Sequence, residues 1–597
     1  ATVRVRTNAA PIAVADTYDN LAGPGAFILH VLDNDSDPDG DPLTIMRVDS
    51  GPYGTATVTG QGIRYMPQPG YAGQDSFAYL VGDPFGETAY VTVSVRVSQK
   101  RQAAPAVSLL IGSGETVFDT PPQFYFPSGT KISGFGPPAL SDYQQAASTI
   151  TLAVGRFTLT GILFQDTNGS RTVMAASTIE APGAAPSLFQ SFSNPVLSPH
   201  GALAFIAKIK APGPRGALAQ GVWSNAFSGD GSLALVLKSG TPITGNGLPA
   251  SASMVSFTSV EATDGALYVL GQLSAPGGAA LLRLDATGTH LLLREKGTLT
   301  PGVVIQHLSV LQPALLSAGQ GRWGGAAGLV AKATLSDHST ALLKIAPDGT
   351  VSRLLSTWPA AAPGDSYAWS GFGLPALTAD GGVAFSGILK TGGRQVLGWR
   401  GLATTDSRLV DAGLPATDAG DARYAAFYDP VAGERGLAYL ALLSGRGVTP
   451  ANRLGLWWND FVNVRKLAQL GDYAPDANGQ FKTPASAGPR WQALTSLALP
   501  GGPEAGPVVL AKVVGPGVNA FNNTGLWALD STGVFRQLLR TGPGALPNEP
   551  RSIRSITTLG ADAGAFGVGR SYNATGSLAV KVVLSDGSQA LVRLDVP

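Results

Sequence analysis

The chain has 597 residues, a formal net charge of +1, 14% charged residues and no cysteine. This length is too great for one simple core, and the lack of cysteine excludes disulfides, thiolate metal sites and a cysteine nucleophile. A near-zero charge without a basic block argues against a nucleic-acid partner, and no apolar run of about 18 residues predicts a membrane span. The 77 glycines and 43 prolines favour short strands joined by tight turns, so we expect an all-β fold.

Residues 1–8 have the pattern of a single strand. The run Ala1–Arg6, followed by Asn8-Ala-Ala-Pro11, repeats the pattern of Val91–Val97 followed by Ala103-Ala-Pro105. Because the later copy ends a predicted domain, the first copy reads as the last strand of a preceding domain, either a trimmed boundary or a donor strand. A lone apolar strand is unstable and pairs with an exposed sheet edge, and head-to-tail donation builds a filament. The predicted partner-binding residues are Thr2, Val3, Arg4, Val5 and Arg6.

Residues 9–98 predict a β-sandwich. Segments such as Gly62–Met66, Asp75–Leu80 and Ala89–Val97 alternate apolar and polar residues, with turns rich in Asp, Gly and Pro between them. Several short strands of this kind in succession indicate two sheets packed face to face. The polar residues 99–104 then form a short linker.

One loop of this region is crowded with carboxylates. Oxygen ligands at alternate positions suit Ca²⁺, and carboxylates this dense repel one another unless they are neutralised. The loop is not an EF-hand, because the twelfth position counted from Asp35 is Met46 in place of glutamate. The alternative is a solvated, metal-free turn of Asp, Pro and Gly. The candidate calcium ligands are Asp16, Asp33, Asp35, Asp37, Asp39 and Asp41.

The same region resembles the cadherin-like, bacterial Ig-like tandem domains of surface proteins. The resemblance rests on Val31–Thr44, which reads Val-Leu-Asp-Asn-Asp-Ser-Asp-Pro-Asp-Gly-Asp-Pro-Leu-Thr, followed by Gly51–Val58 and Tyr65–Phe77. It covers residues 9–98 and implies an Ig-like β-sandwich on a protein that is extracellular or at the bacterial cell surface.

From residue 105 to the end, one hairpin recurs. Its turn glycine supplies the positive φ of a tight turn. Three such glycines occur: the second follows the first by 61 residues, one period, and the third follows the second by 184 residues, three periods. A longer offset of 249 residues, four periods, separates Lys332–Ile345 from the similar Lys581–Leu594. This periodicity in a glycine-rich chain predicts a β-propeller over residues 105–597, with eight blades. The turn glycines are Gly288, Gly349 and Gly533, and Asn463 stands where another such turn is expected.

The last blade is predicted to borrow a strand. The final Leu591–Asp595 matches Leu281–Asp285, but the chain stops before the leucine-rich strand that follows the earlier copy. That strand stands instead at Val107–Gly112, before the first blade. We therefore predict that the N- and C-terminal segments of the propeller share one sheet, which closes the ring and removes its open edges.

The repeats also resemble secreted bacterial proteins that carry an Asn-x-x-Gly-x-x-Ala-Phe motif. Gly201, Ala204 and Phe205 keep the Gly-x-x-Ala-Phe half, as does the copy at 381–385, but Ser198 and Thr378 replace the leading asparagine. Many proteins of this kind look anchored to the cell surface. Neither resemblance implies an established catalytic activity.

No cluster of residues in the sequence identifies a reaction. The five histidines are scattered, with no metal-ligand spacing, although a Ser/His/Asp triad can assemble across a fold. Among the nine tryptophans, we predict that Trp223, Trp399, Trp457 and Trp527 occupy equivalent packing positions between blades. The remaining five are better placed to stack on sugar rings in loops: Trp323, Trp358, Trp369, Trp458 and Trp491.

We expect a non-catalytic extracellular surface protein, a structural or adhesive subunit that polymerises through residues 1–7. Its partners would be copies of itself or a neighbouring surface protein, with no nucleic acid and no membrane span. The alternative is a secreted carbohydrate-binding or polysaccharide-degrading protein with its site over the central channel. Degradation would need two carboxylates about 5–10 Å apart in a cleft. A third alternative is a passive spacer module in a larger surface chain.

Overall fold

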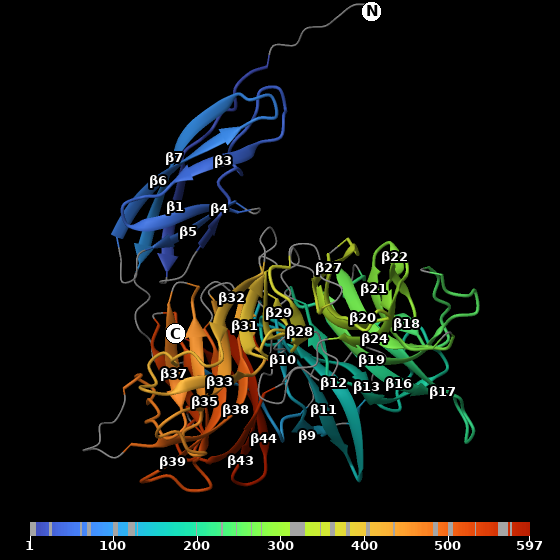
Figure 1. The fold of residues 1–597 in the computed structure, drawn as a ribbon. Helices are drawn as coiled ribbons and strands as arrows, with labels where there is room; N and C mark the ends of the chain where they lie inside the picture. Colours follow the sequence, from blue (N-terminus) through green and yellow to red (C-terminus); the bar gives the residue numbers. More distant parts are fainter. Residues whose placement is uncertain are drawn as a thin grey trace, which may run out of the picture. The chain divides into compact units, whose positions relative to one another are not determined.

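Figure 1 shows the protein, whose structure is a computed structural model. The chain divides into two compact units with a boundary at residues 104 and 105. Within the residues described, every regular element is a strand, so they include no helix able to cross a membrane. The structure describes residues 8–22, 27–59, 62–67, 73–98, 106–116, 126–127, 129–141, 143–198, 200–228, 231–245, 247–263, 265–275, 277–310, 329–346, 348–358, 365–377, 382–400, 406–433, 436–461, 463–480, 488–499, 506–531, 533–547, 549–558, 571–573 and 576–596.

Short strands arranged in two sheets form the first unit. These strands are β1 (Asp16–Ala22), β2 (Phe27–Leu29), β3 (Thr44–Asp49), β4 (Gly54–Thr59), β5 (Gly62–Pro67), β6 (Gly73–Gly82) and β7 (Thr88–Ser98). One sheet has the order β1-β7-β6-β3 and the other the order β2-β5-β4. Strand β1 runs parallel to β7, and the remaining neighbours are antiparallel.

The core of the first unit lies between these two sheets. Along β7, Val91, Val93, Val95 and Val97 are buried, whereas the residues between them are exposed. Branched side chains at this spacing suit a strand with one buried face. Side chains from both sheets meet in one apolar cluster, which includes the fully buried Tyr79. The first unit is therefore a β-sandwich.

The first half of the second unit contains four antiparallel sheets, numbered here in chain order. Sheet 1 contains β9 (Lys131–Phe135), β10 (Ala139–Leu140), β11 (Ala146–Val154), β12 (Phe157–Gln165) and β13 (Arg171–Ala176). Sheet 2 contains β14 (Leu188–Phe192), β15 (Val196–Leu197), β16 (Leu203–Lys210), β17 (Leu218–Ser224) and β18 (Ala234–Lys238). Sheet 3 contains β19 (Met254–Thr263), β20 (Ala266–Leu273), β21 (Ala279–Asp285) and β22 (Gly288–Arg294). Sheet 4 contains β23 (Thr298–Thr300), β24 (Val303–Val310), β25 (Leu329–Leu335), β26 (Thr340–Ile345) and β27 (Val351–Ser356).

The second half continues in the same manner. Sheet 5 contains β28 (Trp369–Phe372), β29 (Ala376–Leu377), β30 (Val383–Leu389), β31 (Gln395–Arg400) and β32 (Ser407–Asp411). Sheet 6 contains β33 (Arg423–Phe427), β34 (Val431–Gly433), β35 (Gly436–Ser444), β36 (Leu454–Asn459) and β37 (Val464–Gln469). Sheet 7 contains β38 (Arg490–Ala498), β39 (Val508–Val514), β40 (Thr524–Leu529) and β41 (Phe535–Arg540). Sheet 8 contains β42 (Ile553–Thr557), β43 (Ser577–Leu584), β44 (Gln589–Asp595) and β8 (Ala106–Gly112).

An apolar cluster lies between each of these sheets and the next along the chain. Leu281 of sheet 3, for example, packs in one cluster with Leu343 of sheet 4. The remaining consecutive pairs of sheets share clusters of the same kind. A further cluster joins sheet 8 to sheet 1 through Leu591, Ile150 and Leu152. This succession of sheets packed face to face is propeller-like.

Strand β8, which contains the Val107–Gly112 segment singled out by the sequence, completes the sheet of the C-terminal strand. It pairs antiparallel with β44, and Ser108 lies opposite Arg593. Gln589 Oε1 then accepts a hydrogen bond from the backbone N–H of Phe135 in sheet 1 (2.9 Å). Gln220 makes the same contact with Phe257 N across sheets 2 and 3 (2.9 Å), and Gln395 with Phe427 N across sheets 5 and 6 (3.0 Å). The glutamine-to-backbone hydrogen bond between sheets 8 and 1 is therefore the same contact that joins sheets 2 and 3 and sheets 5 and 6.

The first strand of several sheets is bent by a proline-containing segment. Such bends separate β9 from β10, β14 from β15, β28 from β29 and β33 from β34. Proline lacks the N–H that a central strand must donate, so these bends are confined to edge strands. Strand β10 contacts β15 of the following sheet and β43 of the preceding sheet. The first strands therefore lie at the inner edge, where neighbouring sheets converge.

Two local predictions differ from the structure. The hairpin turn expected at Asn463 is present between β36 and β37, but the described residue with positive φ in it is Phe461 (69°). Gly288, Gly349 and Gly533 have the predicted positive φ. Trp399 is also not equivalent to the other three tryptophans of its predicted set. Trp223 lies opposite Phe205 on the neighbouring strand, whereas Phe385 of sheet 5 lies opposite Gly398, so Trp399 stands one residue beyond the equivalent position.

Candidate functional sites

Three of the predicted calcium ligands lie together between β2 and β3. One carboxylate oxygen from each of Asp37, Asp39 and Asp41 lies within 4.8 Å of the other two, and all three residues are partly exposed. Asp37 Oδ1 accepts hydrogen bonds from the backbone N–H groups of Asp39 (2.8 Å) and Asp41 (3.3 Å), which folds the loop into an Asx turn. Asp39 Oδ2 accepts from Ala9 N (2.7 Å), which ties the loop to the segment before β1. These oxygens are ligands of the kind that Ca²⁺ takes.

Asp16 and Asp35 form a separate group around Tyr79. The Tyr79 hydroxyl lies 2.7 Å from Asp35 Oδ2 and 3.3 Å from Asp16 Oδ2. Burial, together with repulsion from Asp35, raises the pKa of Asp16 to about 6, and the charge of the exposed Asp33 adds to this rise. The six predicted ligands are therefore divided between a partly exposed triad and a second group around the buried Tyr79.

The residues predicted to bind a partner, Thr2, Val3, Arg4, Val5 and Arg6, lie outside the described part of the chain. Trp323 lies outside it as well. The roles predicted for these residues stay predictions.

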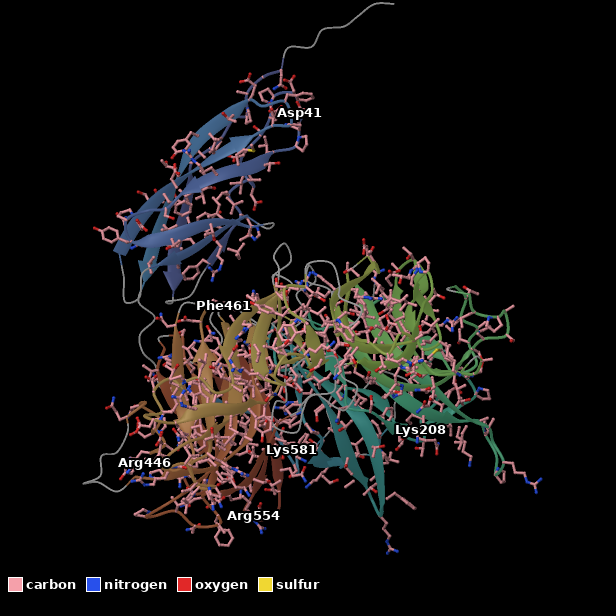
Figure 2. All side chains as sticks on the ribbon, in the orientation of Figure 1. Asp41, Lys208, Arg446, Phe461, Arg554 and Lys581 are labelled. Carbon is pink, nitrogen blue, oxygen red and sulfur yellow. The ribbon has the colours of Figure 1, made fainter. Side chains whose placement is uncertain are left out.

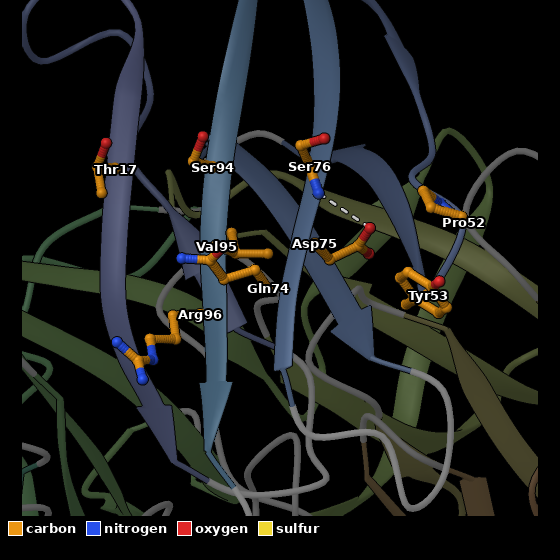
Figure 3. A pocket seen from close by; sticks show the side chains of 9 residues that line it. All are labelled: Thr17, Pro52, Tyr53, Gln74, Asp75, Ser76, Ser94, Val95 and Arg96. Carbon is orange, nitrogen blue, oxygen red and sulfur yellow. Dashed lines mark hydrogen bonds between the residues drawn. The ribbon is translucent and has the colours of Figure 1, made fainter.

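A shallow groove of about 370 Å³ crosses the outer face of the β1-β7-β6-β3 sheet (Figure 3). Thr17, Ser94 and Ser76 are cross-strand neighbours on β1, β7 and β6, so their exposed hydroxyls form one row. Gln74 and Arg96 form an adjacent cross-strand pair at the same face. The groove thus offers hydroxyls, an amide and a guanidinium on one surface.

A phenol ring and a buried carboxylate lie at the border of this groove. Tyr53, in the turn between β3 and β4, is 45% exposed and lines the groove with Pro52. Asp75 is buried beneath the groove, where its Oδ2 accepts a hydrogen bond from the Tyr65 hydroxyl (2.6 Å). A partly exposed phenol ring beside hydroxyls is a surface on which a sugar can stack and form hydrogen bonds. The sequence did not single out this groove, because its residues come from three strands and a turn.

Aspartates of the second unit stabilise hairpin turns. Asp166 Oδ1, for instance, accepts from the backbone N–H groups of Asn168 (2.9 Å) and Ser170 (2.8 Å) between β12 and β13. A hydrogen bond from the Thr287 hydroxyl, with further donors, lowers the pKa of Asp285 to about 2. A carboxylate whose pKa is lowered in this way stays ionised and makes a poor proton donor. Aspartates that accept backbone N–H groups within hairpin turns of the second unit include Asp166, Asp285, Asp337, Asp348 and Asp586.

His290 is the histidine that comes nearest to a catalytic arrangement. Its Nε2 lies 2.9 Å from Thr287 Oγ1 and 3.3 Å from Asp285 Oδ1. Both contacts use the same ring nitrogen, whereas a catalytic triad needs one nitrogen for the nucleophile and the other for the carboxylate. The group therefore stabilises an exposed turn.

A polar cluster joins sheets 4, 5 and 6 at their inner edge. Asp429 Oδ1, in the bend between β33 and β34, accepts hydrogen bonds from Ser386 Oγ (2.8 Å) and Leu374 N (2.9 Å) of sheet 5. Lys332 Nζ of β25 donates to the Phe372 carbonyl (2.6 Å). Burial raises the pKa of Asp429, while the two hydrogen bonds and the charge of Lys332 act to lower it.

A related cluster joins sheets 8, 1 and 2. Lys581 Nζ of β43 donates to the Phe135 carbonyl of β9 (3.1 Å). Thr149 Oγ1 of β11 lies 3.4 Å from Asn194 Oδ1, in the bend between β14 and β15. Lys581, Thr149 and Asn194 are all partly exposed. Figure 2 labels Lys581, on the red C-terminal strands that contact β9 and β10.

The tryptophans mostly serve packing. Trp223, Trp457 and Trp527 are fully buried, and their ring N–H groups donate to the carbonyls of Pro182 (3.0 Å), Thr417 (2.9 Å) and Pro475 (2.9 Å). Of the five tryptophans assigned to sugar stacking, three are buried: Trp369, Trp458 and Trp491. Trp358 is 58% exposed, with Lys390 Nζ 2.7 Å from its ring centroid.

Comparison with known families identifies both units. Residues 8–96 match the sequence model of the bacterial Ig domain. A second family, described as a family of unknown function (DUF7453), matches residues 72–333 and again residues 326–592, together more than half of the chain. The chain belongs to this DUF7453 family. The two matches give the DUF7453 region two related halves, in agreement with the offset of 249 residues between Lys332 and Lys581.

Solved structures similar to this DUF7453 protein are remote. The β-propeller domain of the Trilobed protease from Pyrococcus furiosus is 10% identical over 68% of this chain and 98% of that chain, with a TM-score of 0.33. An acylaminoacyl peptidase from Pyrococcus horikoshii is 12% identical over 68% of this chain and 52% of that chain, with a TM-score of 0.32. The polysaccharide lyase Uly1 is 9% identical over 91% of this chain and 90% of that chain, with a TM-score of 0.24. Scores this low carry no argument about activity, and no curated protein matches the chain significantly.

Proposed function

We propose that this DUF7453 protein is a non-catalytic structural or adhesive subunit outside the bacterial cell, and that its second unit is a closed propeller of eight blades. The contact between sheets 8 and 1 supports closure, because Gln589 binds Phe135 N as Gln220 and Gln395 bind the following sheet. The bacterial Ig domain at residues 8–96 supports a place among surface proteins.

The main support for a non-catalytic role is that aspartates of the second unit stabilise its hairpin turns. Its turn aspartates accept backbone N–H groups within their own hairpins, and for Asp285 the hydrogen bond from the Thr287 hydroxyl lowers the pKa to about 2. A general acid needs a pKa near the operating pH. Hairpins whose aspartates are held in this way suit a rigid building block.

We further propose that residues 1–7 donate a strand to a neighbouring copy and build a filament. Electron microscopy of the purified full chain tests this directly, with filaments of regular repeat as the expected result. Replacing Val3 and Val5 by aspartate should abolish the filaments, because charged side chains cannot enter the acceptor core. The matched control replaces Arg4 and Arg6 by lysine, which keeps the strand pattern and should leave filaments intact. Monodisperse particles for the unmodified chain would refute polymerisation.

Glycan binding is the second candidate, favoured by the groove of Figure 3 and the exposed ring of Tyr53. Tyr53→Ala and Arg96→Ala should each weaken retention of the protein on immobilised polysaccharide. Thr59→Ala, on a strand that does not line the groove, serves as the control. Unchanged retention in both groove variants would remove this candidate, and release of shorter sugars by the unmodified chain would overturn the non-catalytic proposal.

A further inference from the structure

The two polar clusters at the inner edge occupy equivalent places in the two halves of the second unit. Lys332 and Lys581 are the same residue of the 249-residue repeat. Each donates to the last residue before a bend, Phe372 in one half and Phe135 in the other. The next residue in both bends is a glycine, and Gly136 N donates to Thr149 O (2.7 Å) as Gly373 N donates to Ser386 O (2.8 Å).

These contacts make Thr149 the counterpart of Ser386, and Asn194 the counterpart of Asp429. In both halves the bend needs glycine, because a Cβ at Gly373 would collide with Asp429 Oδ1 and Ser386 Oγ, and one at Gly136 would collide with Thr149 Oγ1. A Cβ at Gly136 would also lie 3.2 Å from Asn194 Oδ1. The backbone of the two clusters is therefore alike, and their charge differs at one side chain.

That side chain decides the charge of each cluster. In the second half, the Asp429 carboxylate accepts two hydrogen bonds and lies in the field of Lys332. In the first half, Asn194 is neutral, and no carboxylate of a described residue forms an ion pair with Lys581. One Lys581 N–H donates to Phe135, and an ammonium group has three donors. The Nδ2 donors of Asn194 have no partner among the described residues.

We propose that the first-half cluster binds a carboxylate-bearing ligand beside Lys581, and that this ligand supplies the negative charge that the Asp429 side chain supplies in the second half. Lys581 supplies the positive charge and Asn194 Nδ2 supplies further donors, while the Thr149 hydroxyl donates to Asn194 Oδ1 and orients the amide. Pro137 stands where Leu374 donates its N–H in the second half, so one backbone donor is lost and the lysine carries more of the binding. Partial exposure of Lys581, Thr149 and Asn194 leaves the cluster open to a ligand.

The test is calorimetric titration of the full chain with sodium acetate and with sodium glucuronate, at constant ionic strength set with sodium chloride. We expect saturable binding of at least one of the two carboxylates at one site. Binding of both would assign recognition to the carboxylate alone, and binding of glucuronate only would assign it to a sugar acid. Glucose, which has no carboxylate, should not bind at this cluster.

Variants that exchange the two clusters give the sharpest result. Asn194→Asp builds the internal carboxylate into the first half and should weaken binding at least tenfold, as should Lys581→Met. Asp429→Asn removes the internal carboxylate from the second half and should raise the stoichiometry from one to two. Far-ultraviolet circular dichroism and the melting temperature show whether each variant is folded. Heat changes no larger than those of sodium chloride, or equal binding in Asn194→Asp, Lys581→Met and the unmodified chain, would overturn the proposal.

Discussion

Two aspartates, one in each unit, are held in opposite ways. In the second unit, Asp285 accepts hydrogen bonds within its own turn, and its pKa falls to about 2. In the first unit, burial and repulsion from Asp35 raise the pKa of Asp16 to about 6. The turn around Asp285 stabilises the anion, whereas the surroundings of Asp16 favour the protonated acid.

This difference separates structural acids from candidate ligands. A carboxylate with a lowered pKa contributes stability by itself, and a group of carboxylates with unbalanced charge gains stability only when a proton or a cation arrives. We therefore predict that the second unit depends on packing and on the pairing of β8 with β44. We predict that calcium stabilises the first unit.

The largest effect is expected from opening the second unit. Replacing residues 106–112 by glycine and serine removes the fourth strand of sheet 8 and the buried side chains of Leu110 and Ile111. Loss of these two side chains alone costs on the order of 5 kcal/mol. Differential scanning calorimetry should show loss of the transition of the second unit, with the transition of the sandwich unchanged. An unchanged transition of the second unit would mean that β8 does not close it.

Calcium should act on the other unit. If the triad of Asp37, Asp39 and Asp41 binds Ca²⁺, the ion at a hundredfold excess over its dissociation constant stabilises the sandwich by about 2.7 kcal/mol. Calorimetry with and without calcium measures this shift. Replacing the three aspartates by asparagine should remove it, and magnesium at the same concentration is the control for ionic strength. No shift in the unmodified chain would leave the loop as a turn without metal.

A smaller effect of the same origin is expected at Asp16. Its folded pKa of about 6 lies above the ordinary value of 3.8, so the folded state binds a proton that the unfolded state has lost. The sandwich should therefore gain stability as the pH falls from above 6 towards 4, and lose it as the pH rises through the folded pKa. Asp16→Asn should raise the free energy of unfolding at pH 7 by about 1 kcal/mol. Urea unfolding of the sandwich at pH 4.5 and at pH 7, monitored by tyrosine fluorescence, measures the effect. An equal or smaller free energy of unfolding for Asp16→Asn at pH 7 would contradict the prediction.

The smallest effect is expected at Asp285, with the opposite sign. Because its folded pKa is lowered, its contribution is present above the unfolded pKa near 3.8 and is lost as the pH falls through about 2. Exposure to solvent limits the contribution at pH 7 to a few tenths of a kcal/mol. Thermal unfolding of Asp285→Asn, compared with the unmodified chain at pH 7 and pH 2.5, should show a larger difference at the higher pH.

The sequence predicted most successfully where a signal is local or repeated. The alternating aspartates from Asp37 to Asp41 meet because they share one turn, and the pairing of β8 with β44 could be read from a missing copy of a repeated strand. Asp16 is separated from the triad because its position depends on the placement of β1 in the sheet. Asn194 and Asp429 gave no signal, since their partners lie on the preceding sheet. Trp399 was misplaced because Gly398 occupies the position opposite Phe385, one residue before the tryptophan.

The pairing of β8 with β44 is the central claim, and cross-linking tests it most directly. The chain has no cysteine, so Ser108→Cys combined with Arg593→Cys places two thiols opposite each other without competitors. The matched positive control is Arg283→Cys with His290→Cys, the equivalent pair within sheet 3, and Ser108→Cys with Arg283→Cys is the negative control. We predict that mild oxidation cross-links the first two pairs to a similar extent and leaves the third unlinked. Efficient linking of the sheet 3 pair, without any linking between the thiols introduced at positions 108 and 593, would contradict the ring.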